Sequence, residues 1–404
     1  MSTGSARWAM PVKSNREKMP KILGVIMARN EYGLISVSVS HALNTLCDEV
    51  LLLVHDSTEE FEKEVLDLAS LWPGRIRLFK INQKTFRQEN ALNILRFMAS
   101  SLDYAWIYPF DADEFPMSND FTQIKSYLDN LNSECIAVRY KIENWVSFSD
   151  FNINSYPDFL KISELSIPML DLDISSPMKK SEIISGNFNF FDFQFGTKVI
   201  FRNTAQFALL PGAHSLLNLP SDLETSVTED VFKVAHLPFL SKERLQLRSE
   251  QGENLINAGF SESHGWQSQM VYQISQKGEL VDFWLAHSVH SGAVMPSRTQ
   301  FSSIGDSSFR EAIISTVDLL KSNKSREKIE DQAFQSIDEL LECVDFINIG
   351  YSSNRTHNAS VMLDRDIALG DWDIALAESD SHLASRMWKF FSPYRNLKDF
   401  LKRL

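Results

Sequence analysis

The chain has 404 residues, of which 44% are hydrophobic and 23% are charged, an ordinary composition for a soluble globular protein. This length exceeds what one hydrophobic core usually organises, so we expect two domains or one domain with a long appendage. The net charge of −13 argues against broad nucleic-acid binding, which needs a basic surface. The three cysteines, Cys47, Cys135 and Cys343, fit neither a disulfide framework nor a zinc spacing, which favours a reducing cytosol.

The sequence contains no apolar run of the roughly 18–20 residues that span a bilayer. Residues 1–20 are polar and basic and lack an apolar signal core, so we interpret them as a tail. These features predict a cytoplasmic protein.

Short apolar runs alternate with amphipathic stretches from residue 22 onward. The runs predict strands at 22–27, 49–55, 75–81 and 104–110, with helices at 34–46, 59–72 and 88–101 between them. Residues 35–40 also alternate like a strand, but a parallel sheet needs a crossover there, which favours a helix. The order βαβαβαβ predicts an α/β fold with a mostly parallel sheet flanked by helices. A helix at 119–131 and a strand at 135–142 follow.

Polar side chains follow three of these strands directly. Arg29-Asn30-Glu31 follows the first strand, Asp56 the second, and Asp111 to Glu114 the fourth. Ligands in open α/β sheets bind beyond the carboxyl ends of the strands, so we expect these groups to share a site. The first turn lacks Gly-x-Gly-x-x-Gly, which argues against the usual dinucleotide fold.

The segment Asp111-Ala112-Asp113-Glu114-Phe115 ends a buried aromatic strand with three carboxylates. Buried carboxylates need water, a partner or a metal, and Mg²⁺ and Mn²⁺ prefer oxygen ligands. We therefore predict a metal–diphosphate site. Asp-x-Asp alone more often marks a solvated loop or a helix start. The phosphatase-type Asp-x-Asp nucleophile has Thr or Val where this chain has Phe115, which argues against that chemistry.

The pattern loosens after residue 143. Residues 144–187 are interpreted as long loops that could cover a site. Five phenylalanines lie within 188–195, and they are interpreted as core or lid interior, with an acceptor-stacking platform as the alternative. A strand is expected at 198–201 and a helix at 241–258, with Ser241 as N-cap and Gly259 as stop. Further helices are expected at 307–322 and 326–344.

Together these motifs resemble the family 2-type glycosyltransferases of GT-A fold, and most closely the bacterial members with an Asp-x-Asp-Glu-Phe motif. The resemblance spans about residues 20–250, and its matching segments are 28–31, Gln88-x-Asn90, 111–115 and His236 to Ser241. It implies a Rossmann-like GT-A domain at 21–240. A mainly helical C-terminal region at 241–404 follows.

The resemblance implies an inverting, hexosyltransferase-type transfer from a nucleotide-sugar donor to a glycan, polysaccharide or lipid-linked acceptor, with Mn²⁺ or Mg²⁺. Asp113 would be the main metal ligand, Asp111 would contact the ribose or the metal through water, and a histidine would complete the metal site. His236 is the first candidate and His214 the second. The nucleoside pocket would comprise Arg29, Asn30, Glu31 and Asp56, with Gln88 and Asn90 on the base or ribose and Lys198 on a phosphate.

This chemistry needs positive charge next to the leaving diphosphate, whose negative charge it stabilises. It also needs a carboxylate that deprotonates the acceptor hydroxyl. The sequence leaves the base open among Glu114, Glu143, Glu182 and Asp192, and Glu114 could instead hold the loop. Plainer interpretations also stay open: the two histidines as core residues, Lys198 as a strand-edge charge, and Arg29 as a partner of Glu31.

Two other functions are considered. A non-catalytic GT-A-like nucleotide-sugar-binding or scaffold protein would be expected to lose some of these site residues. A nucleotidyltransferase usually has a Gly-rich first turn, which residues 28–31 lack.

The C-terminal segment 386–404 is basic, and its Leu397, Phe400, Leu401 and Leu404 follow helical spacing. Such a helix can lie on the inner face of an anionic membrane, which would suit a lipid-linked acceptor. The alternative is a terminal helix that docks on the protein or on a second subunit.

Overall fold

The computed structural model describes residues 19–83, 88–100, 102–152, 156–159, 176–193, 196–204, 207–261, 265–288, 307–323 and 333–338. The tail expected at 1–20 lies almost entirely outside this set, as does the basic segment 386–404. Within the described residues, no helix is long and apolar enough to cross a membrane.

The first half of the sheet is parallel. Its strands are β1 (Ile22–Ala28), β2 (Glu49–His55), β3 (Ile76–Ile81) and β4 (Trp106–Pro109), in the order β3-β2-β1-β4. Helices α1 (Leu34–Thr45), α2 (Glu59–Leu71) and α3 (Gln88–Ala99) connect consecutive strands. The predicted βαβαβαβ order is therefore confirmed, including the helix at the ambiguous stretch 34–46.

The second half of the sheet is mixed. β7 (Lys198–Arg202) runs antiparallel to β4 and to β6 (Ala137–Asn144), and α4 (Phe121–Asp129) precedes β6. β9 (Lys233–His236) lies parallel to β6, and β5 (Glu114–Met117) lies antiparallel to β9. β8 (Glu224–Ser226) also pairs with β6. Most pairings are parallel, so the α/β fold class with a mostly parallel, helix-flanked sheet is confirmed.

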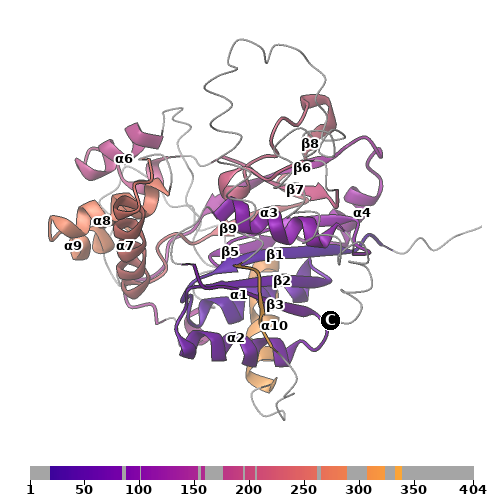
Figure 1. The fold of residues 1–404 in the computed structure, drawn as a ribbon, viewed down its shortest axis with the longest axis horizontal. Coiled ribbons are helices and arrows are strands. Elements are labelled where there is room, and N and C mark those ends of the chain that lie inside the picture. The colour runs from indigo at the N-terminus through magenta and orange to yellow at the C-terminus, as the bar shows by residue number, and fades with distance from the viewer. Residues whose placement is uncertain are drawn as a thin grey trace, which may run out of the picture.

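The alternation of side chains along the strands builds a core on each face of the sheet. Ile22 and Ile26 of β1 join α1 and α2 on one face, whereas Leu23 and Val25 join α3 on the other. Figure 1 shows α3 on the opposite side of the sheet from α1 and α2. Packing on both faces fixes the strands, and the polar residues that follow them lie at the carboxyl ends of the strands.

A second body of helices, which we call the helical lobe, lies beside the sheet (Figure 1). It comprises α6 (Ser176–Ile184), the 3-10 turn Phe190–Asp192, α7 (Lys242–Asn257), α8 (Trp266–Gln276) and α9 (Leu280–Ala286). Phe190, Phe191 and Phe193 are buried in its core, as the core interpretation of the phenylalanine cluster predicted. The expectation of loops throughout 144–187 is wrong at α6 and at the single turn α5 (Tyr156–Phe159).

Part of the chain beyond the lobe returns to the sheet. α10 (Ser307–Asn323), predicted as a helix, packs on α1, and its Phe309 is buried there. The helix expected at 326–344 is wrong at β10 (Gln335–Ser336), which pairs with β3. The free edge of β3 supplies the ladder partners, and Asp338 accepts hydrogen bonds from Asn82 N–H and Nδ2 at 2.8 Å each.

Candidate active site

The acidic segment forms a tight turn between β4 and β5. The Glu114 N–H donates to the Asp111 carbonyl at 3.0 Å, and the Leu237 N–H donates to the Asp113 carbonyl at 2.9 Å. The apolar residues of β4 are buried, which fixes the strand in the core. The acidic residues therefore begin where this buried strand ends. The side chain of Asp111 is 38% exposed, whereas that of Asp113 is only 5% exposed.

Each carboxylate oxygen of Asp113 has a different neighbour. Oδ2 lies 3.1 Å from an Arg248 guanidinium nitrogen and 3.4 Å from two nitrogens of Arg244. Oδ1 faces His236 Nε2 at 3.9 Å. Burial would raise the pKa of Asp113, but the surrounding positive charge, that of Arg244 above all, outweighs burial and holds this pKa well below its ordinary value. Asp113 is therefore ionised.

The His236 ring is held in one orientation by β6. Its Nδ1–H donates to Asn144 Oδ1 at 2.7 Å, which leaves the Nε2 lone pair on the side of Asp113. Burial lowers the pKa of His236 to about 4, so the imidazole is neutral, as a metal ligand must be. The second candidate, His214, is exposed, and its Nδ1 bonds the Thr197 carbonyl at 3.0 Å.

Lys198 fastens the acidic turn from β7. Its buried ammonium lies 2.7 Å from Asp111 Oδ2 and 2.5 Å from Glu114 Oε1. Burial would lower the pKa of Lys198, but the two carboxylates raise it above its ordinary value. The Glu114 side chain is 2% exposed, and its other oxygen accepts from the Asp111 N–H at 3.2 Å. Burial raises the pKa of Glu114 to about 8. Glu114 thus holds the turn and presents almost no surface to an acceptor.

The ends of β1 and β2 are joined by polar contacts. Arg29 pairs with Asp56 at 2.9 Å. The alternative interpretation, which paired Arg29 with Glu31, is therefore wrong about the partner. The Thr58 N–H donates to Asn30 Oδ1 at 3.0 Å. Asn30 and Asp56 have φ values of 53° and 36°, and such left-handed backbone lets both turns reverse at the sheet edge. Glu31 instead accepts from Arg244 Nε at 2.8 Å.

The start of α3 lies beside the same turn. Gln88 Nε2 lies 3.4 Å from Asp111 Oδ1, at the limit of a hydrogen bond. Asn90 is buried, two residues further along α3. The structure therefore brings Gln88, Asp111 and Lys198 into one cluster.

The other base candidates lie in separate surroundings. Glu143 pairs with Lys233 at 3.1 Å, and it alternates along β6 with Asn144, so the two side chains point to opposite faces. Glu182 accepts from Asn187 within the helical lobe at 2.9 Å. Asp192 caps its own turn by accepting from the Asn189 N–H at 2.7 Å.

Sequence analysis missed Arg244 and Arg248. Their i, i+4 spacing behind the Ser241 N-cap was visible, but such basic pairs usually lie on a solvated helix face. Ser241 does cap α7, since its Oγ accepts from the Arg244 N–H at 3.3 Å, and Gly259 follows the helix at φ 75°. The packing of the helical lobe, which the local sequence does not specify, turns the two arginines toward Asp113.

The donor set suits a hard cation that takes most of its ligands from a substrate. Among the described residues, no group of three or more His, Cys, Asp or Glu side chains could hold a metal ion. Asp113 Oδ1 and His236 Nε2 nevertheless face each other, one ionised and one neutral. Magnesium-type sites are commonly built from one or two protein ligands together with substrate phosphates and water. Asp113 and His236 fit that description.

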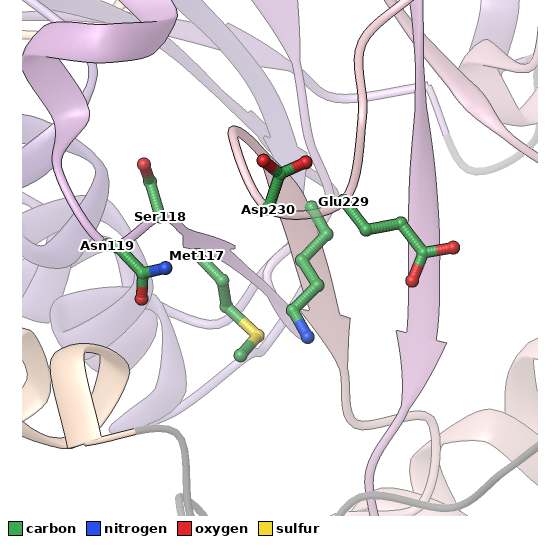
Figure 2. A pocket seen from close by; sticks show the side chains of 6 residues that line it. Met117, Ser118, Asn119, Glu229 and Asp230 are labelled. Atoms are coloured by element: carbon green, nitrogen blue, oxygen red, sulfur yellow. The ribbon is translucent and has the colours of Figure 1, made fainter.

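Two cavities lined by described residues lie in different parts of the molecule. A small one is lined by Arg29, Glu31, Arg244, Leu247, Arg248 and Gln251. The other, in Figure 2, is lined by Met117, Ser118, Asn119, Glu229, Asp230 and Lys233. Met117 pairs with Lys233 at one end of the β5–β9 ladder, and Glu114 pairs with His236 at the other. The cavity in Figure 2 is therefore separate from the acidic turn.

Comparison with known proteins gives weak structural similarity. No protein-family model matches the sequence, and no curated protein is similar to it. A solved structure of S. aureus TarS 1–349 is 11% identical, with a TM-score of 0.32 over 86% of this chain and 94% of that one. The mannosyltransferase PcManGT from Pyrobaculum calidifontis, with GDP-Man and Mn²⁺, is 10% identical, with a TM-score of 0.32 over 84% and 81%.

A third structure belongs to a different class of transferase. It is a Bacillus anthracis protein described as a glucose-1-phosphate thymidylyltransferase, 7% identical, with a TM-score of 0.27 over 74% of this chain and 96% of that one.

Proposed function

We propose that the chain is a metal-dependent glycosyltransferase of GT-A type that uses a nucleotide-sugar donor. The observation that carries the proposal is the pair formed by Asp113 and His236. An ionised carboxylate and a neutral, oriented imidazole lie 3.9 Å apart at the carboxyl ends of the strands, and the carboxylate belongs to the motif Asp111 to Phe115. Their spacing and protonation states match a cation site that a diphosphate completes.

The charges of the cluster support the need for a cation. Lys198, Arg244 and Arg248 are each already paired with carboxylates. An entering diphosphate would add negative charge that these pairs do not balance. A divalent cation held by Asp113 and His236 would supply that charge and act as a Lewis acid on the leaving diphosphate.

The remaining residues receive binding roles. Asp111, with an exposed side chain, would contact the ribose, and Gln88 would orient Asp111. The Arg29–Asp56 pair and the Asn30 turn would shape the nucleoside pocket. Lys198 would act by holding the turn, because its ammonium is buried between Asp111 and Glu114.

The finer features of the reaction follow from the family resemblance. We propose inverting, hexosyl-type transfer to a glycan, polysaccharide or lipid-linked acceptor on the cytoplasmic side of a membrane. Glu143 would act as the general base on the acceptor hydroxyl only after its carboxylate leaves Lys233.

The test is a thermal-shift panel of UDP, GDP, ADP, CDP and dTDP and their sugar derivatives, with Mn²⁺ or with EDTA. A ligand that binds only the folded state stabilises it by about 2.7 kcal/mol at a hundredfold excess over its dissociation constant. We expect one base to give a Mn²⁺-dependent shift in the parent chain and in Asp103→Asn, a fully exposed control. Absence of any shift would contradict the proposal and favour the scaffold alternative.

A further inference from the structure

The helical lobe places two arginines on the carboxylate that the proposed cation would use. Arg244 and Arg248 are one turn apart on α7, so both side chains project from the same face of that helix. With Leu247 and Gln251 they line the small cavity against Arg29 and Glu31 at the end of β1. Three guanidinium groups and one carboxylate surround this cavity, so its charge suits an anion. Its volume of about 10 Å³ admits no more than a water molecule, so a phosphate would enter only by displacing a side chain such as that of Arg248.

The two arginines are held differently. Arg244 is anchored by Glu31 at 2.8 Å, and its contacts with Asp113 are longer, at 3.4 Å. Arg248 has Asp113 as its carboxylate partner at 3.1 Å, together with the neutral Gln267 at 3.3 Å. Among the described residues Arg248 has no second ion pair, so it can leave Asp113 without breaking one, whereas Arg244 stays fixed by Glu31.

We infer that Arg248 exchanges Asp113 for the donor's diphosphate and thereby couples diphosphate binding to cation binding; this inference rests on the proposed function. Two guanidinium groups beside Asp113 repel a cation that approaches without a nucleotide. Phosphate oxygens accept hydrogen bonds from a guanidinium in bidentate geometry, so a diphosphate that approaches beside the small cavity competes well for Arg248. The exchange leaves only Arg244 of the two arginines beside Asp113 Oδ2, so the repulsion of a cation at Asp113 Oδ1 weakens.

This coupling has a definite thermodynamic form. If the diphosphate raises the affinity for the cation, the cation must raise the affinity for the diphosphate by the same factor. Removal of Arg248 should then change the two separate affinities in opposite directions. The cation alone should bind more tightly, since Asp113 loses a competing charge, and the diphosphate alone should bind more weakly.

The experiment measures Mn²⁺ binding alone by electron paramagnetic resonance and nucleoside diphosphate binding in EDTA by calorimetry. The probe is whichever of the five diphosphates binds the parent chain most tightly. For Arg248→Ala we expect about tenfold tighter Mn²⁺ binding and about tenfold weaker diphosphate binding, within the usual range of coupling factors. Lys242→Ala, an exposed position on the same helix, should leave both affinities unchanged.

Equal or weaker Mn²⁺ binding by a folded Arg248→Ala chain would overturn the inference, because mere disruption of the site lowers both affinities. Parent protein that binds no diphosphate even with Mn²⁺ present would overturn the proposed function and this inference with it. Where Arg248→Ala does not fold, Arg248→Lys serves: it retains the charge but not the bidentate fork. Its Mn²⁺ affinity should match the parent while its diphosphate affinity falls severalfold, and an unchanged diphosphate affinity would contradict the exchange.

Discussion

The sheet and the helical lobe contribute complementary charges to one site. From the sheet come Asp111 and Asp113, at the end of a strand whose neighbours are set by short crossovers. From the lobe come Arg244 and Arg248, on a helix positioned by contacts far away in sequence. The acids follow from local chain order, and the arginines follow from tertiary packing.

The two regions are joined where adjacent residues enter different cores. Trp145 and Leu240 lie in the core beneath the sheet, whereas their neighbours Val146 and Phe239 lie in the core of the helical lobe. The Ser147 hydroxyl donates to the Phe239 carbonyl at 3.0 Å and ties the two crossing segments together. This crossing fixes the start of α7 and therefore the positions of Arg244 and Arg248 next to Asp113. The following changes separate the contribution of each region.

The largest effect is expected for Asp113→Ala. It removes the Asp113 contacts with both arginines, and loss of one partner of a buried ion pair costs about 3–5 kcal/mol of unfolding free energy. Mn²⁺-dependent nucleotide binding should also disappear. Chemical denaturation and calorimetry measure both. In Asp113→Ala/Arg248→Ala part of the lost stability should return, because one unpaired charge is removed. A simple sum of the two single effects would show that the side chains act independently.

The same contrast explains what the sequence could predict. Strands β1 to β4 and the acidic turn were predictable because apolar runs, crossovers and strand-end polar groups are local patterns. His236 was predictable as a metal candidate only through its place in a family-like segment, and its Asn144 partner was not. The structure shows that partner because β6 and β9 are in register at Asn144 and His236.

The missed features depend on contacts between distant segments. α6 is short and rich in polar residues, and packing on α8 stabilises it more than its own sequence pattern does. β10 has two residues and exists because β3 offers a free edge. The sequence around Arg248 is typical of a solvated helix face. Arg248 belongs to the site only because the packing of α7 places it next to Asp113.

A smaller effect, about 3 kcal/mol per residue, is expected from two buried histidines, one in each region. Burial lowers the pKa of His41 on α1 and of His287 beyond α9 to about 4, from 6.5. The unfolded chain therefore binds more protons between pH 6.5 and 4, so unfolding free energy falls as the pH falls through this window. His41→Phe and His287→Phe should each reduce the fall in unfolding free energy between pH 7 and pH 4 by about 3 kcal/mol. Chemical denaturation across this pH range measures the change. A separate transition that responds only to His287→Phe would show that the lobe unfolds independently.

The smallest effect concerns Gly252, where α7 crosses α8. A Cβ there would lie 2.0 Å from the Ser268 carbonyl oxygen, so Gly252→Ala must push the helices apart. We expect a loss of about 1–3 kcal/mol, typical of overpacking, together with weaker diphosphate binding, because Arg248 lies one turn away. Gly259→Ala is the matched control: its φ of 75° strains a side chain by about 1–2 kcal/mol, but no atom of the described residues lies within 4 Å of the added Cβ. Equal diphosphate affinity in both variants would mean that the α7–α8 contact stabilises the lobe without positioning Arg248. The position of Arg248 would then be set by the chain segment at Phe239 and Leu240.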